Sequence, residues 1–137
     1  MKVEITDNSQ IFINAKNRAI AAALESIGQT AEGYAVMNCP VDTGRLRGSI
    51  THATTEYKGK GSYTDDRGNG YNDATARATP EKEAVYIGSN VEYARRQELS
   101  DSYHHASGQA HFLRDAVTTH GDEYKRIAEI QLKKADL

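Results

Sequence analysis

Histidines and aspartates in the C-terminal third of the chain are the first candidates for chemistry. Four of the five histidines fall in a stretch that also holds two aspartates: Asp101, His104, His105, His111, Asp115 and His120. His111 and Asp115 are four residues apart, which places two ligands on one face of a helix, as metal sites often require. The neighbouring His104 and His105 point apart in an extended chain. Two interpretations stay open, a metal site and ordinary polar positions. We favour the second and expect no metal or other cofactor.

The patterns of nucleophilic and phosphate chemistry are missing from the sequence. It contains no Gly-x-Ser-x-Gly elbow, no Gly-x-Gly-x-x-Gly and no Gly-Lys-Ser/Thr, the arrangements that expose a nucleophile or cradle a phosphate. The single cysteine, Cys39, precedes Pro40 at the end of a predicted helix and is expected to be a small packing residue. A lone cysteine also excludes an intramolecular disulfide. We therefore predict that the protein is not an enzyme, with a small metal-dependent hydrolase as an alternative.

Residues 58–80 contain no Ile, Leu, Val, Met or Phe but four glycines. Such a segment has too little apolar surface to fold alone. We predict a long mobile hairpin arm that is solvated or bound by a partner. Basic and aromatic side chains in and beside it are the candidates for partner contact: Tyr57, Lys58, Lys60, Tyr63, Arg67, Tyr71 and Arg77.

The same arm suggests a second alternative, a nucleic-acid-binding module. Lysine and arginine neutralise phosphates and tyrosine rings stack on bases. Asp65, Asp66 and Asp73 lie among these positive charges, so the net charge of residues 58–80 is only about +1. The near balance favours an arm that meets a protein or solvent.

Composition points to one small domain of 137 residues, with a body over residues 1–57 and 81–137 and the arm between. Ile, Leu, Val and Phe together number only 23 and the net charge is −2. A thin core raises the expectation of subunits that complete their burial against copies or partners. The chain shows neither a membrane-span run nor the apolar start of a signal peptide, so we expect a soluble protein.

Periodicity predicts an α+β fold, two long helices packed on a small antiparallel sheet. A helix over residues 14–38 has one apolar face, formed by Ile20, Leu24, Ile27, Ala31 and Tyr34. Its polar face, expected to meet solvent, carries Lys16, Arg18, Glu25, Gln29 and Glu32. Gly28 and Gly33 either mark close contacts or weaken the helix.

The remaining elements follow from shorter signals. Residues 49–57 and 84–89 are rich in β-formers and predict two paired strands, with Val85 and Ile87 on one face and Tyr86 on the other. A short helical turn is expected over residues 90–98, and a polar loop over 99–110. A final helix is expected over 112–134, where Gly121 is a possible kink.

The densest motif is the turn between the first helix and the first predicted strand. Pro40 ends the helix, Asp42 or Thr43 can bond nearby amides, and Gly44 can take a positive φ. Arg45 and Arg47 require carboxylate partners or solvent, and the expected partners are Asp42 and Glu98. The motif thus predicts a rigid corner joining helix to sheet.

Three blocks of sequence resemble the tail-component family of long-tailed bacteriophages. The first is Pro40-Val41-Asp42-Thr43-Gly44-Arg45-Leu46-Arg47 followed by Ser49-Ile50. The second is Val85-Tyr86-Ile87-Gly88-Ser89-Asn90-Val91-Glu92-Tyr93-Ala94 with Glu98, and the third is His111-Phe112-Leu113-Arg114-Asp115-Ala116. The blocks occur in the family's order and cover most of the chain outside the arm.

The resemblance implies a virion structural protein of a phage or prophage, located at the neck and assembled in the host cytoplasm. Such a subunit acts in tail completion and head–tail joining as part of a homo-oligomeric ring. Its expected partners are head-completion or connector proteins and tail-terminator proteins. DNA would pass through the lumen without sequence-specific binding, and no membrane is involved. The motif residues then become candidates for a structural corner and for subunit contacts: Asp42, Thr43, Gly44, Arg45, Arg47, Tyr93, Glu98, Phe112 and Arg114.

Overall fold

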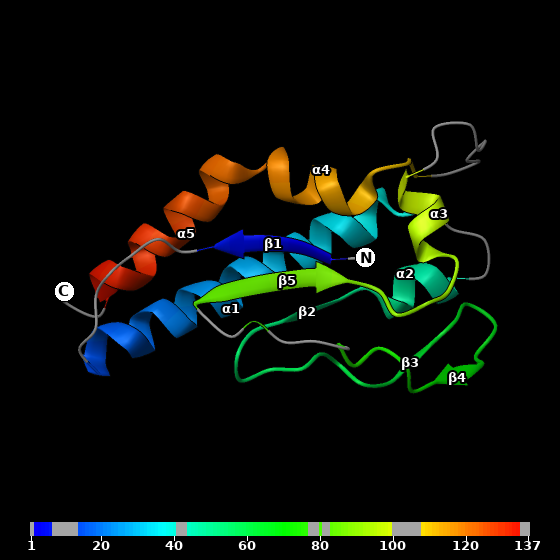
Figure 1. Cartoon of the computed structure of the whole chain (residues 1–137), viewed down its shortest axis with the longest axis horizontal. Helices are drawn as coiled ribbons and strands as arrows, with labels where there is room; N and C mark the ends of the chain where they lie inside the picture. The colour runs from blue at the N-terminus through cyan, green and yellow to red at the C-terminus, as the bar shows by residue number, and fades with distance from the viewer. Residues whose placement is uncertain are drawn as a thin grey trace.

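A computed structural model describes residues 2–6, 14–40, 44–76, 80, 83–99 and 108–134. A long helix, α1 (Asn14–Asn38), lies behind a three-stranded antiparallel sheet of β1 (Lys2–Thr6), β5 (Ala84–Gly88) and β2 (Thr51–Ala53) (Figure 1). Two further helices, α4 (Phe112–Thr118) and α5 (Gly121–Lys134), run back along α1. The α+β class expected from the sequence is confirmed.

Helix α1 begins and ends where the sequence predicted, with Pro40 two residues beyond its end. The predicted apolar face is buried at Ile20, Leu24, Ile27 and Ala31, and Tyr34 is half-buried. The buried alanines of α1 let the sheet and α4 approach closely, which is how a chain poor in large apolar residues still forms a continuous core.

Strand β5 is the centre of the sheet, with β1 and β2 on either side. Val85 and Ile87 are buried and Tyr86 is half-exposed, as the alternation predicted. Strand β1 was not expected, because the alternation of its five residues is too short to stand out in the sequence; in the fold it pairs with β5 and also contacts α4. The predicted strand over residues 49–57 was too long. Its first residue belongs to a short helix, α2 (Arg45–Ser49), and only Thr51–Ala53 forms β2.

The predicted final helix is two helices. Thr119 and His120 separate α4 from α5, and Gly121 begins α5 rather than bending a continuous helix. The His120 ring stacks on Tyr34 of α1 with ring centroids 3.5 Å apart. The Tyr124 hydroxyl donates a hydrogen bond to the Ala116 carbonyl. The first contact joins the residues between α4 and α5 to α1, and the second joins α5 to α4.

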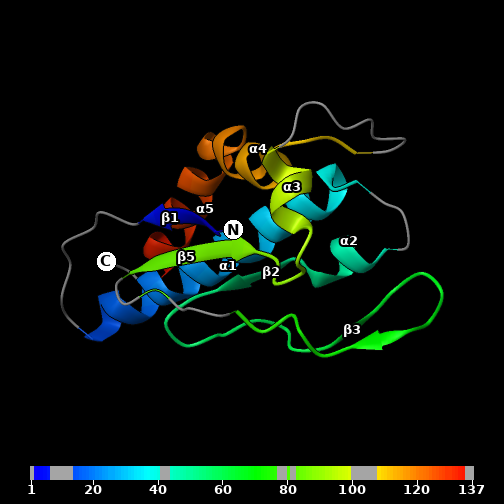
Figure 2. The ribbon, with the colours of Figure 1, turned by 45° about the vertical axis from the view of Figure 1, so that its right-hand side comes forward.

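The described part of the arm, residues 58–76, folds back on the body. Strands β3 (Tyr63–Thr64) and β4 (Gly70–Tyr71) pair as a small hairpin beside α2 (Figure 2). Next to this hairpin, where residue 61 precedes β3 and residue 74 follows β4, the Ala74 amide donates to the Gly61 carbonyl at 3.0 Å. The Asn90 side-chain amide binds the carbonyls of Asp73 and Thr75. Backbone pairing and polar contacts replace the missing apolar residues, so the segment lies against the molecule rather than projecting from it.

Gly28 is a close-contact position of α1, whereas Gly33 has open space around it. A Cβ at Gly28 would lie 2.7 Å from His52 Cδ2 and 2.8 Å from Val85 Cγ2. We expect Gly28→Ala to destabilise the fold by about 1–2 kcal/mol, because overpacking outweighs the gain in helix propensity. Gly33→Ala, the matched control, should stabilise by up to about 1 kcal/mol. Urea unfolding of both variants measures the difference, and equal effects would contradict the close contact.

Candidate functional site

The predicted corner is the turn into α2. Gly44 caps this helix with φ of 84°, a left-handed conformation that favours glycine, and it is buried. The Gly48 amide donates to the Gly44 carbonyl at 2.9 Å. Asp42 and Thr43 lie outside the described residues. The sequence therefore located the corner but not the short helix within it.

Arg45 and Arg47 both bind carboxylates of the hairpin. Arg45 Nη2 lies 3.2 Å from Asp73 Oδ2, and its guanidinium carbon lies 4.5 Å from the centroid of the Tyr71 ring. Arg47 Nη2 lies 2.8 Å from Asp66 Oδ1. The expected pairing with Glu98 was wrong, because Glu98 is occupied elsewhere. The two arginines instead join the corner to a segment about twenty to thirty residues further along the chain.

Tyr63 and Tyr71 stack across the hairpin with ring centroids 5.2 Å apart. Burial raises the pKa of the Tyr63 hydroxyl to about 12, and the neighbouring Asp73 adds to the rise. The Tyr63 hydroxyl and the Arg45 guanidinium lower the pKa of Asp73. The tyrosines predicted as partner contacts thus pack on each other and on the corner.

Asp65 organises the turn of the hairpin, a role that the sequence did not reveal. Its Oδ1 accepts the amides of Arg67 and Asn69, both at 2.9 Å. Its Oδ2 accepts the Asn69 side-chain amide and the Tyr71 hydroxyl, both at 3.1 Å. A carboxylate that accepts nearby backbone amides is typical of turns rich in Asp, Asn and Gly. The run of Asp, Asn and Gly over residues 65–70 is the sequence signal that could have identified this turn.

Glu98 is the most buried charged side chain of the motif set, with 1% of its surface exposed. It lies on α3 (Ala94–Leu99) and accepts the amides of Leu113 at 2.9 Å and Arg114 at 3.0 Å. These amides belong to the first turn of α4, where no intrahelical acceptor exists. Glu98 therefore joins α3 to α4 and is not a surface contact.

Three more motif residues divide between the core and the surface. Phe112 is fully buried and packs in the core, so of the two roles expected for the motif residues it has the structural one. Tyr93 is half-buried and packs against the core. Arg114 is exposed and lies 3.3 Å from Asp115. Among these residues Arg114 offers the most surface to a partner.

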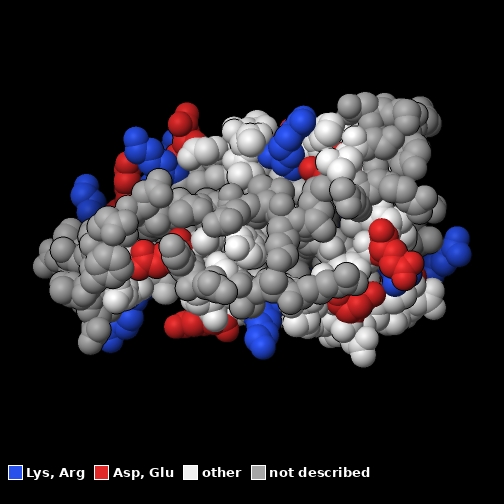
Figure 3. All heavy atoms as spheres, in the orientation of Figure 1, with Lys and Arg blue, Asp and Glu red and all other residues white. Residues whose placement is uncertain are grey.

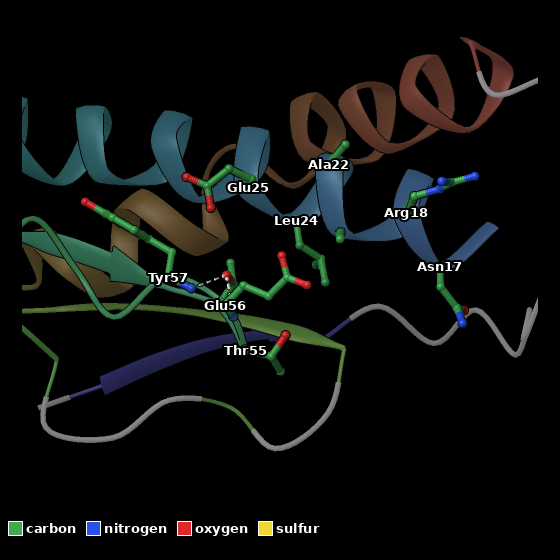
Figure 4. Close-up of a pocket in the computed structure, with 10 residues that line it drawn as sticks. Asn17, Arg18, Ala22, Leu24, Glu25, Thr55, Glu56 and Tyr57 are labelled. Atoms are coloured by element: carbon green, nitrogen blue, oxygen red, sulfur yellow. Dashed lines mark hydrogen bonds between the residues drawn. The ribbon is translucent and has the colours of Figure 1, made fainter. Parts of the chain in front are cut away.

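A hollow of about 570 Å³ lies between the start of α1 and the loop that follows β2 (Figure 4). Ala21, Ala22 and Leu24 supply its apolar lining, and Arg18, Glu25 and Glu56 its charges. The Thr54 hydroxyl accepts the amide of Tyr57 at 3.1 Å. Small apolar side chains beside half-exposed charges are typical of a surface hollow and not of an enclosed active site.

His52 forms a buried ionic cluster that the sequence did not reveal. Its ring contacts the carboxylates of Glu25 and Glu32, which were expected on the solvent face of α1. The two glutamates are seven residues apart and so share one face of the helix. The Tyr57 ring lies beside them, 4.7 Å from the His52 ring. The spacing of Glu25 and Glu32 in the sequence places both carboxylates on one face of α1. No neighbouring residue in the sequence identified His52 as their partner.

Some of the candidate metal ligands and the single cysteine lie in the described part of the chain. There, no group of three His, Cys, Asp or Glu side chains is arranged to hold a metal ion. Asp101, His104 and His105 of the candidate cluster lie outside it. Asp115 accepts the Gln109 side-chain amide at 2.6 Å. Burial raises the pKa of the Cys39 thiol to about 12, so the thiol stays protonated and packs in the core as predicted.

Among the described residues, positive charge does not gather on the hairpin or beside it. Lys58, Lys60 and Arg67 are exposed, whereas Arg45 and Arg47 are paired with aspartates, and Arg77 lies outside the described residues. On the face drawn in Figure 3, blue and red side chains alternate along the rim. None of the described helices is long and apolar enough to cross a membrane.

Comparison with protein-family models, with curated proteins and with solved structures found no match to this chain.

Proposed function

We propose that this chain is a structural subunit of the neck of a tailed phage or prophage particle, without catalytic activity. It would complete the tail and join it to the head as part of a homo-oligomeric ring. Its neighbours would be a head-completion or connector protein and a tail-terminator protein, with DNA crossing the lumen without sequence-specific contact. Assembly would take place in the host cytoplasm.

One observation carries the proposal beyond the resemblance: the three motif blocks meet at one end of the fold. The Ser49 and Ser89 hydroxyls, from the first and second blocks, lie 2.5 Å apart in the core. Glu98 joins the second block to the third through the amides of Leu113 and Arg114. The Ser49, Ser89 and Glu98 side chains of the motifs are thus used in structural bonds inside the subunit. Motif residues that hold a subunit together, rather than converge on a cavity, favour an assembly protein over an enzyme.

The mixed surface charge and the half-exposed arginines at the corner fit a protein that meets other proteins. Arg45 and Arg47 keep 35% and 40% of their side-chain surface exposed while paired. A rotational ring requires one patch of a subunit to meet a different patch of the next. The corner with its hairpin, at one end of α1, is the patch we assign to that contact.

Deleting the gene from the phage or prophage that encodes the chain tests the proposal. We expect filled heads and separate tails that fail to join, seen by electron microscopy, with joining restored by the wild-type gene. Mass spectrometry should find the chain in purified particles. Infectious particles of normal form that lack the chain would overturn the proposal. Complementation with Arg45→Ala tests the corner, and Arg126→Ala on the exposed part of α5 is its matched control.

A further inference from the structure

The His52 side chain is held between two carboxylates of α1 and is 5% exposed. Its Nε2 lies 2.7 Å from Glu25 Oε1, and its Nδ1 lies 3.2 Å from Glu32 Oε1. The His52 backbone amide donates to the same Glu32 oxygen at 3.0 Å. Three polar contacts therefore join a single residue of β2 to α1.

A charged imidazole satisfies both of these contacts with ionised carboxylates. A neutral ring carries one N–H and can donate to only one of the two carboxylates, whereas the imidazolium donates to both. Burial by itself lowers the pKa of His52, but the carboxylates of Glu32 and Glu25 outweigh it and raise the pKa above its ordinary value. The cluster is thus complete only while His52 holds its second proton.

His52 also lies at the root of the hairpin. Thr51, its neighbour in β2, accepts the Lys60 amide on its hydroxyl at 3.1 Å, and the Thr54 amide donates to the Tyr57 carbonyl at 2.9 Å. The titratable groups facing His52 are Glu25 and Glu32 from α1 and Tyr57 from the loop that follows β2, and Lys60 of the same loop acts on Glu32. On the sheet, Ile87 of β5 lies directly across from His52 and contributes no charge.

We propose that His52 is a charge-operated latch that fastens β2 and the root of the hairpin to α1, closed while the imidazole is doubly protonated and loosened when it loses a proton. The latch adds to the arginine, asparagine and backbone contacts of the hairpin by fixing the strand from which the segment departs. It does not depend on the neck function proposed above, because it concerns only how this chain holds its own hairpin.

The sign of the pH effect follows from the raised pKa of His52. A raised pKa means that the folded state binds the proton more tightly than the unfolded chain does. The stabilisation is fully present below about pH 6.5, the ordinary value for histidine, and is lost as the pH rises through the folded value. The latch therefore weakens as the pH rises above the ordinary value for histidine.

Hydrogen exchange of the intact chain at about pH 6 and about pH 8.5, corrected for the intrinsic rate, tests the latch. We expect the protection of residues 51–61 to be lower at the higher pH, by a factor of about ten for each unit by which folding raises the pKa of His52. The loss should be complete once the pH exceeds this raised pKa. Protection of α5 should change less. His52→Gln should remove the pH dependence of residues 51–61, because glutamine does not titrate.

Two matched variants separate His52 from other titrating groups. His120→Gln, which alters the stack on Tyr34, and Lys60→Arg, which keeps the charge, should both retain the pH dependence of residues 51–61. An NMR titration of the wild-type ring gives a direct readout that does not depend on any variant folding. Titration of His52 at or below about pH 6.5, or an undiminished pH effect in His52→Gln, would overturn the proposal.

Discussion

Phe112→Ala is expected to lower the free energy of unfolding by about 3–5 kcal/mol, the largest loss that we predict for a single substitution. Phe112 is the largest of the fully buried side chains among the described residues and has no exposed surface. It begins α4, and with Leu113 and Ala116 it forms the face of that helix that enters the core. Alanine would lose the ring's contacts and leave a cavity, and urea unfolding monitored by circular dichroism measures the effect.

Two variants control for the loss of the ring. Phe112→Leu keeps most of the apolar volume and should cost about 1–1.5 kcal/mol. Ile130→Ala removes a large apolar side chain that is 48% exposed and should change stability by less than about 0.5 kcal/mol. If Phe112→Ala left stability unchanged, the residue would be a surface contact as its motif position first suggested, and the core placement would be refuted.

Glu98→Ala is expected to cost about 3 kcal/mol, because two amides at the start of α4 would lose a charged acceptor inside the protein. Leu113 and Arg114 donate these amides at 2.9 and 3.0 Å. The loss should appear as faster hydrogen exchange at the first turn of α4 and as a lower urea midpoint with an unchanged slope.

The substitution Glu98→Gln refines this prediction. Glutamine keeps one acceptor oxygen but turns an NH₂ group toward the second amide. Glu98→Gln should therefore lower the free energy of unfolding by less than Glu98→Ala does. Glu92→Ala, at an exposed position before α3, is the matched control and should change stability by less than about 0.5 kcal/mol. Equal effects of Glu98→Ala and Glu92→Ala would show that Glu98 does not cap α4.

These predictions change how the motif is interpreted. Glu98 and Phe112 matched the resemblance as candidate contacts, yet both are buried and hold α4 in place. Arg45, Arg47 and Arg114 keep exposed surface and remain candidates. Assembly assays should therefore target the arginines, because changes at the buried pair would disturb the fold before they disturbed any contact.

Local pattern alone determined the bounds of α1, the central strand β5 with its buried Val85 and Ile87, and the packing role of Cys39. Each depends on periodicity or on a neighbouring proline, and these act within a few residues. The glycines and the lack of large apolar side chains in residues 58–80 were also visible in the sequence, but the pairing of β3 with β4 was not.

Only the tertiary structure decided which partners the polar residues have. The Arg45 contact with Asp73 spans 28 residues, and the His52 contact with Glu25 spans 27. The break between α4 and α5 lies where His120 stacks on Tyr34 of α1. A charged or aromatic side chain can satisfy its bonds with any of several equivalent groups, so its own sequence neighbourhood does not select one. Packing of distant elements makes that choice, because burial penalises every arrangement that leaves the group unpaired.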